Sequence, residues 1–332
     1  MIALKLVFET IFSDSKFVVG SLVSIGIWSS ICAYGVFRLD QKAQEDHHGT
    51  SAKWLEIIAM GRDPLRVIGS LFGFALVFRF KICYDRWWEG RQLWGQIITG
   101  CLDLAIQINR WMANQDIVDR FNRFLVVYCY ACKNILGHKS LVDSGDGEKM
   151  IIRRLLTRNE LKEIQDYPCW EPHFCLEVMR ELLSNAYLVK GGFYLEEAKM
   201  HSQVYRCFDN SIKDLNDRIG QCIAVQSSEL PEVYDGLHLF AFTLYFTAAP
   251  VIWATTMLWV VIPMSLLVSF IALGLIKLGT ELVDPFGDDE VDIPLESFCL
   301  TIEQQIDAII QRRARGKFKE LVATEKTKVM SA

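Results

Sequence analysis

The sequence predicts an all-α membrane protein with about four membrane helices per chain and a helical extramembrane body. Residues 237–276 contain no Asp, Glu, Lys or Arg over forty positions, and residues 17–37 form a second uncharged stretch of 21. About 20 apolar residues suffice to cross a hydrocarbon core that is ~30 Å thick. Charged residues nevertheless make up 23% of the chain and the mean hydropathy is only +0.20, so much of the protein lies outside the membrane.

The first two membrane segments are expected at residues 17–37 and 64–82. The first starts too late and is too long to be the apolar part of a cleaved signal peptide. The second begins at Pro64 with only twelve uninterrupted apolar residues, 67–78, and continues into charged sequence. Such a helix is too short to face lipid over its whole length, which predicts that other copies of the chain shield it.

The last two membrane segments are expected at residues 237–256 and 257–278, with a turn near Pro250 or Pro263. Residues 83–235 and 284–327 are assigned to the extramembrane body, and the whole chain, 1–332, is interpreted as a single domain.

Apolar residues in this body recur every three or four positions, which is typical of amphipathic helices. The clearest stripe comprises Val204, Phe208, Ile212, Leu215, Ile219 and Cys222. Residues 297–323 are expected to form another helix, with a break near Gly316.

Composition and motifs argue against nucleic-acid binding, a zinc site and enzymatic activity. The net charge of −5 argues against a nucleic-acid partner. Cys129 and Cys132 form one CxxC with His138 nearby, but no second pair completes a zinc site, and the ten cysteines are interpreted as free thiols. The chain lacks a Walker lysine loop, a GxGxxG and a GxSxG motif, so no catalytic residues and no enzymatic activity are predicted.

Two segments carry a family resemblance. Residues 78–95, FRFKICYDRWWEGRQLWG, and residues 281–296, ELVDPFGDDEVDIPLE, resemble the bestrophin family and its bacterial, fungal and plant relatives. The order of the apolar segments is similar too, so the resemblance extends over residues 7–311. It implies a multi-pass homopentameric channel in a lipid bilayer, with one central pathway for chloride and other small anions. In the calcium-gated animal members, calcium binds a clasp beside the pore.

Ser70, Phe74 and Phe78 are the candidate lining of a narrow neck, because the spacing i, i+4, i+8 places them on one helix face. Five copies around an axis would form rings of hydroxyl and then phenyl groups, and a phenyl constriction can gate by dewetting. Ring edges are weakly electropositive and tolerate an anion better than a cation. The alternative is ordinary helix packing. The family neck falls on these residues, although Ser70 departs from the bulky aliphatic residue often found there.

Lys81 follows the neck and is a fourth candidate pore residue. Five lysines near one end of a pore would concentrate anions. The alternative is an ordinary ion pair with Asp85, four residues later on the same helix face.

The acidic run contains the candidate calcium ligands Glu281, Asp284, Asp289 and Asp292. Calcium prefers six to eight oxygen ligands, with carboxylates and carbonyls mixed. The resemblance implies that these four positions match the calcium clasp, with carboxylates replacing amides at Glu281 and Asp284. The alternative is a solvated acidic turn that caps the following helix.

Two other functions remain open from the sequence: a homologue that conducts cations such as sodium, and a membrane scaffold that conducts nothing. A reversal potential measured under a chloride gradient distinguishes them from an anion channel.

Overall fold

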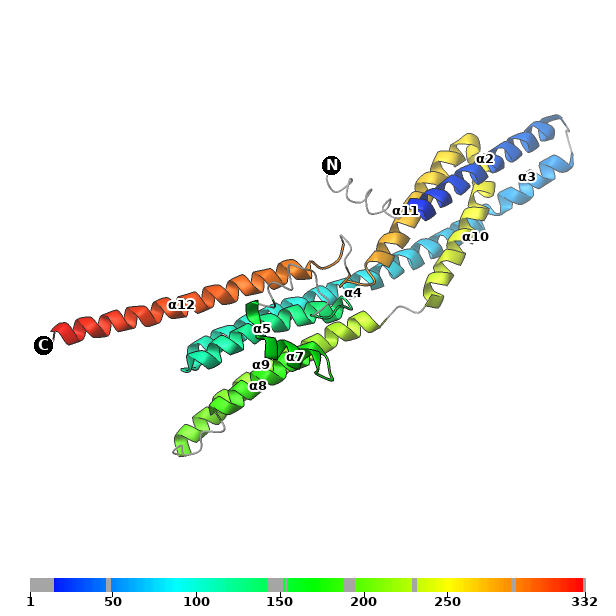
Figure 1. Cartoon of the computed structure of the whole chain (residues 1–332). Coiled ribbons are helices and arrows are strands. Elements are labelled where there is room, and N and C mark those ends of the chain that lie inside the picture. The colour runs from blue at the N-terminus through cyan, green and yellow to red at the C-terminus, as the bar shows by residue number, and fades with distance from the viewer. Residues whose placement is uncertain are drawn as a thin grey trace. The chain divides into compact units, whose positions relative to one another are not determined.

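The computed structural model describes residues 15–45, 49–141, 152, 154–187, 195–228, 232–287 and 291–330. Within these ranges every regular element is a helix (Figure 1). The helices are α2 (Ser15–Glu45), α3 (Thr50–Met60), α4 (Arg62–Trp111), α5 (Gln115–Leu136), α7 (Arg158–Gln165), α8 (Glu171–Tyr187), α9 (Leu195–Ser227), α10 (Glu232–Met257), the short 3₁₀ helix η1 (Leu258–Val260), α11 (Val261–Glu281) and α12 (Leu295–Met330).

Three segments are long and apolar enough to cross a membrane: Val18–Glu45, Thr50–Trp111 and Gly236–Glu281. The last of these contains both α10 and α11, so it holds two helices, as the sequence predicts. These segments are what an integral membrane protein requires.

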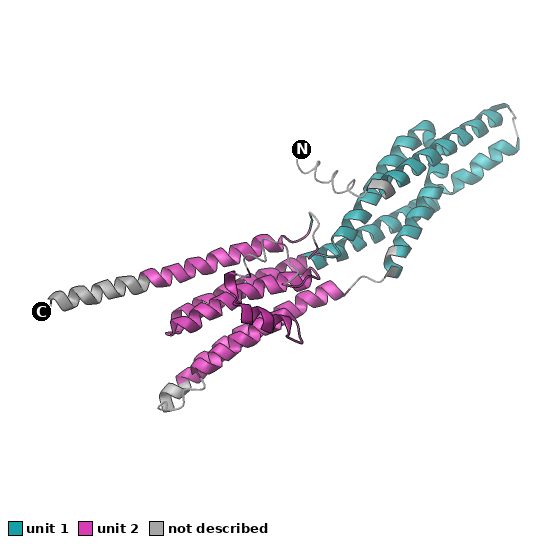
Figure 2. Ribbon diagram, in the orientation of Figure 1, with its two compact units in different colours: residues 1–87, 229–284, 289–291 teal, residues 88–228, 285–288, 292–332 magenta. Residues whose placement is uncertain are grey.

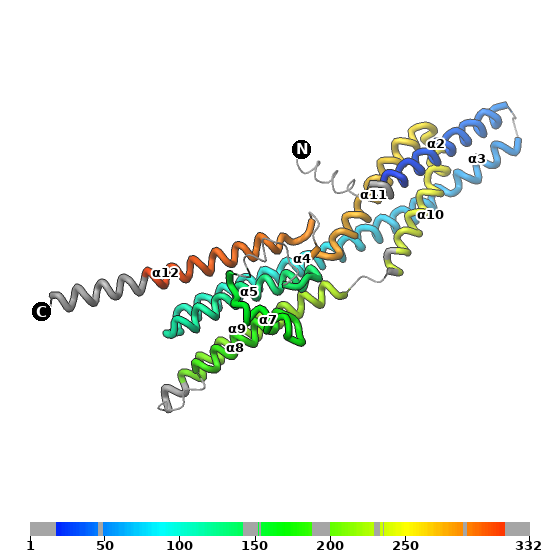
Figure 3. The backbone as a smooth tube through the Cα atoms, in the orientation of Figure 1, coloured from blue at the N-terminus to red at the C-terminus, as the bar shows by residue number. Residues whose placement is uncertain are grey.

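The chain turns between α10 and α11 (Figure 3). The turn lies at η1, where Leu258 has a φ of 47°. Pro250, one of the two positions expected for this turn, instead lies inside α10. The other, Pro263, lies in the first turn of α11, where the missing N–H of proline removes no helical hydrogen bond. A proline inside a membrane helix is tolerated because neighbouring groups satisfy the freed carbonyl.

The chain divides into two compact units (Figure 2). Unit 1 comprises residues 1–87, 229–284 and 289–291, and unit 2 comprises residues 88–228, 285–288 and 292–332. The 50-residue helix α4 contributes its first half to unit 1 and its second half to unit 2.

Unit 1 is built from α2, α3, α10, α11 and the first half of α4 around an apolar core. The core consists of Val18, Ile25, Leu76, Phe242, Phe246, Ala272 and Leu273. Residues from α2, α4, α10 and α11 therefore meet in one cluster, and the indole Nε1 of Trp28 donates to the carbonyl of Thr247 over 3.0 Å to tie α2 to α10.

Unit 2 packs around α5, whose middle is buried on all sides. Phe121, Phe124 and Tyr128 are fully buried, and the Tyr128 hydroxyl donates to the carbonyl of Leu215 in α9 over 2.9 Å. The predicted stripe of α9 is confirmed, since its residues from Phe208 to Cys222 are buried.

The break expected in the last helix at Gly316 is wrong. α12 continues through this position to Met330. One glycine costs a helix only about 1 kcal/mol relative to alanine, which the surrounding Lys, Glu and Ala residues offset.

The cysteines are free thiols. Cys129 and Cys132 are fully buried in α5, and burial raises the pKa of the Cys132 thiol well above its usual value. Because the thiolate is the form that binds metal or attacks a disulfide, this CxxC is not prepared for either chemistry.

Candidate functional site

The four predicted pore residues form one exposed stripe on α4, hereafter the α4 stripe: Ser70, Phe74, Phe78 and Lys81. Phe74 is 73% exposed and Phe78 is 50% exposed in the single chain. Their rings stack with centroids 6.2 Å apart and planes inclined by 16°. The structure therefore brings the two phenyl groups together, with the hydroxyl of Ser70 before them and the ammonium of Lys81 after them.

The opposite face of α4 packs into unit 1. Phe72 stacks on Tyr245 with centroids 5.4 Å apart. Gly69 allows this close approach, since a Cβ at this position would lie 2.9 Å from the Tyr245 hydroxyl oxygen. The buried ring of His238 lies with Nε2 3.2 Å from the carbonyl oxygen of Ala75. These contacts set the rotation of α4, so the α4 stripe faces away from the packed helices of its own unit.

Lys81 forms the ion pair with Asp85 that the sequence offered as the alternative reading. The two side chains are 62% and 55% exposed, so the pair lies at the surface of the unit. Lys81 thus belongs to the α4 stripe by position, while Asp85 offsets part of its charge.

Arg79 was not recognised from the sequence as an anchor. It is 2% exposed and donates to the carbonyl of Ile276 over 3.1 Å and to the hydroxyl of Thr280 over 3.2 Å. Both partners lie in the last turns of α11, where carbonyl groups favour a cation. Gly279 allows this approach, since a Cβ there would lie 2.8 Å from Arg79 Nη1.

One signal for this anchor was present in the sequence. An arginine next to an apolar membrane run must find a polar partner, because an unpaired charge there is expensive. Since successive helical residues are rotated by about 100°, the residue after Phe78 points away from the α4 stripe. The partner itself, about 200 residues later, could not be identified without the fold.

The acidic run begins where α11 ends. Glu281 pairs with Lys277 over 3.4 Å, Asp284 is exposed, and Asp292 is half-buried. Asp289, the fourth predicted calcium ligand, lies outside the described residues. In the part of the chain that the structure describes, no three His, Cys, Asp or Glu side chains gather as a metal site. The described residues alone do not make a calcium site, so this assignment stays a prediction.

Residues 16–308 match the family described as bacterial/fungal bestrophin proteins. The chain is 28% identical over 254 residues to a protein of Nostoc sp. named as a voltage-dependent anion channel-forming protein, covering 73% of this chain and 76% of that one. A protein of Ralstonia nicotianae with the same descriptive name is 24% identical over 278 residues, covering 79% and 82%.

Solved structures show the same fold. A variant of a bacterial bestrophin homologue from Klebsiella pneumoniae superimposes with a TM-score of 0.71 at 22% identity, covering 89% of this chain and 99% of that one.

Proposed function

Because the chain belongs to the bacterial and fungal bestrophin family, we propose that it forms a membrane channel for chloride and other small anions. Two relatives named as anion channel-forming proteins support transport rather than catalysis. We propose further that five copies of the chain surround one pathway, with Phe74 and Phe78 at its neck.

This proposal rests on the order of chemical groups along the α4 stripe. Large exposed apolar groups mark an interface, a lipid-facing surface or a ligand pathway. The same stripe also carries the hydroxyl of Ser70 and the Lys81–Asp85 ion pair. Charged groups in membrane segments face the bundle interior or a water-filled cavity rather than acyl chains. A stripe that changes from hydroxyl to phenyl to charge therefore fits a water-filled axis with a dry constriction.

Other exposed apolar residues on α4 support the assembly. Val67, Leu71 and Val77 are 60%, 64% and 59% exposed and adjoin the α4 stripe. In a closed ring these side chains pack against the neighbouring copy while the stripe faces the axis, and a closed ring uses one repeated interface.

The test is the reversal potential of purified protein in a planar bilayer under a tenfold chloride gradient. An anion channel gives a potential close to the chloride equilibrium value, about 59 mV in magnitude for a tenfold gradient of a monovalent ion. The opposite sign indicates the cation-conducting alternative. An absence of current at protein levels that insert into the bilayer supports the scaffold and contradicts the proposal.

Calcium regulation through Glu281, Asp284, Asp289 and Asp292 is a separate part of the proposal. The position of the acidic run supports this part of the proposal. The run follows the end of α11, and hydrogen bonds from Arg79 connect α11 to α4, the helix that carries the proposed neck. Four carboxylates held close together repel one another unless a cation intervenes, so calcium would order the run.

We expect Asp289→Ala and Asp292→Ala to weaken calcium binding in calorimetry and to reduce any current that a chelator abolishes. If the wild-type protein binds no calcium and its current ignores the chelator, the acidic run is only a solvated cap.

A further inference from the structure

A cleft of about 260 Å³ lies in unit 2, apart from the α4 stripe. α5 contributes one helix face to it through Asn122, Arg123 and Val126, and α12 contributes another through residues 303–310. Arg154 and Leu155 close the cleft on the side of the segment that precedes α7.

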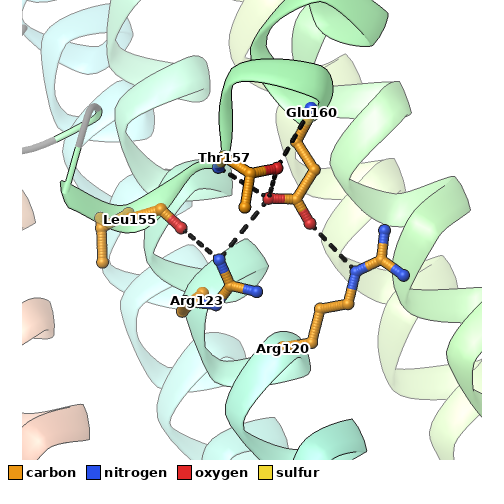
Figure 4. Close-up of polar contacts among 5 residues, drawn as sticks. All are labelled: Arg120, Arg123, Leu155, Thr157 and Glu160. Atoms are coloured by element: carbon orange, nitrogen blue, oxygen red, sulfur yellow. Dashed lines mark hydrogen bonds and ion pairs between the residues drawn. The ribbon is translucent and has the colours of Figure 1, made fainter.

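The two guanidinium groups of the cleft are held in place by other residues. Arg123 donates to the carbonyl of Leu155 over 2.7 Å and lies 3.5 Å from Glu160 (Figure 4). Arg154 bonds to Glu303, which also accepts a hydrogen bond from the Tyr130 hydroxyl over 3.2 Å. A guanidinium has five N–H donors, so each keeps donors for a ligand.

Glu160 is the centre of the arrangement that fixes Arg123. Burial acts to raise the pKa of its carboxyl group, but hydrogen bonds from Thr157 and the charges of Arg123 and Arg120 outweigh burial and lower it. Glu160 is therefore ionised at neutral pH, and Arg123 is oriented before any ligand arrives (Figure 4).

Two polar groups of the cleft have no partner among the described residues. Asn122 is 2% exposed; its Oδ1 accepts from Asn109 over 3.1 Å, but its Nδ2 has no acceptor. A buried amide donor without an acceptor is unfavourable, but Nδ2 has less than 1 Å² of accessible surface, so a ligand in the cleft does not contact it. At the rim, the carboxylate of Asp307 is exposed and receives no hydrogen bond or ion pair from the described side chains.

The mixed charges of the cleft disfavour a ligand that carries only positive or only negative charge. Asp119, Glu303 and Asp307 line it together with Arg123 and Arg154, so three carboxylates face two guanidinium groups. A simple anion is repelled by the carboxylates. A simple cation is repelled by the two guanidinium groups.

We propose that the cleft binds a small zwitterion, namely an α-amino acid with an apolar side chain. Its carboxylate accepts from the N–H donors that Arg154 and Arg123 keep, and its ammonium group bonds to Asp307. The side chain contacts the apolar wall formed by Val126 and Ile306. The volume corresponds to about nine water molecules at roughly 30 Å³ each, which suits a molecule of the size of leucine.

The experiment is calorimetric titration of the purified full-length protein with L-leucine, leucinamide and isocaproate. Leucinamide lacks the carboxylate and isocaproate lacks the ammonium group, while both keep the side chain. We expect leucine to bind and each analogue to bind about tenfold more weakly or worse, since each loses a charge-assisted interaction. Equal affinity for either analogue, or no binding of leucine, overturns the proposal.

Variants make the assignment specific. Asp307→Asn keeps the shape of the side chain and should weaken leucine binding about tenfold. The matched control is Asp214→Asn, an exposed carboxylate on α9 of the same unit, which should leave leucine affinity unchanged. If Asp307→Asn and Asp214→Asn have the same affinity for leucine, leucine binds elsewhere and the proposal fails. If leucine does not bind and Asp307→Asn weakens the oligomer, a side chain of a neighbouring copy occupies the cleft, and the proposal also fails. These outcomes do not depend on conduction, so they are independent of the channel test.

Discussion

Gly279→Ala tests the anchor that joins α11 to α4. The added Cβ would lie 2.8 Å from Arg79 Nη1, closer than carbon and nitrogen atoms normally approach, so the guanidinium must move. Movement sacrifices a charge-assisted hydrogen bond to Ile276 or Thr280, worth about 1.5–3 kcal/mol. Alanine gains about 0.5–1 kcal/mol over glycine in a helix. The net effect is a loss of about 0.5–2.5 kcal/mol.

The measurement is thermal unfolding of the purified protein in detergent, followed by tryptophan fluorescence. A loss of this size lowers Tm by about 1–10 °C, taking roughly 2–4 °C per kcal/mol. The matched control is Gly35→Ala in α2, where a Cβ meets nothing within 4 Å and only the gain in helix propensity applies. Gly35→Ala should leave Tm unchanged or raise it.

Repeating the Gly279→Ala substitution in an Arg79→Met variant tests whether contact with the Arg79 guanidinium causes the loss of stability. In the Arg79→Met variant the guanidinium is absent, so adding Gly279→Ala should no longer destabilise the protein. Such a vanishing effect is the coupling that a double-mutant cycle measures. The reasoning is refuted if Gly279→Ala lowers Tm by the same amount with and without Arg79, or if it behaves like Gly35→Ala.

Three further predictions concern the neck, the assembly and unit 2. Replacing Phe74 and Phe78 together by Ala should wet the neck and raise the current, and an unchanged current–voltage curve would remove both residues from the pathway. Native mass spectrometry should find a pentamer of about 190 kDa, five times the chain mass of 38.1 kDa, and a stable monomer or dimer would contradict a shared pore. Glu160→Gln should destabilise the protein by about 1.5–3 kcal/mol at pH 7, because the carboxylate binds Arg120 and Arg123. The pKa of Glu160 lies below its usual 4.5, so the stability difference between the wild-type protein and Glu160→Gln should be largest above about pH 5 and should shrink as the pH falls through and below 4.5. A stability difference that does not depend on pH would show that the charge is not the cause.

Local patterns predicted much of the fold, because they act within single helices. The uncharged runs lie in helices that are long and apolar enough to cross a membrane, and the apolar stripe of α9 is buried as its spacing predicts. The exceptions also have local causes. Pro250 does not end α10, and Gly316 does not break α12, because one unfavourable residue is outweighed by the helix around it.

The sequence by itself determined that the chain is helical, enters a membrane and carries a stripe of Ser70, Phe74 and Phe78, since composition and helical period are properties of neighbouring residues. It did not determine which phenylalanine packs inside its own unit: Phe72 is partly buried against Tyr245, whereas Phe74 is exposed. Only the tertiary structure decided this, and only it gave Arg79 its partners in α11. The physical reason is the same in both cases. The rotation of a helix and the partner of a buried charge depend on contacts between segments far apart in the chain, which no local period specifies.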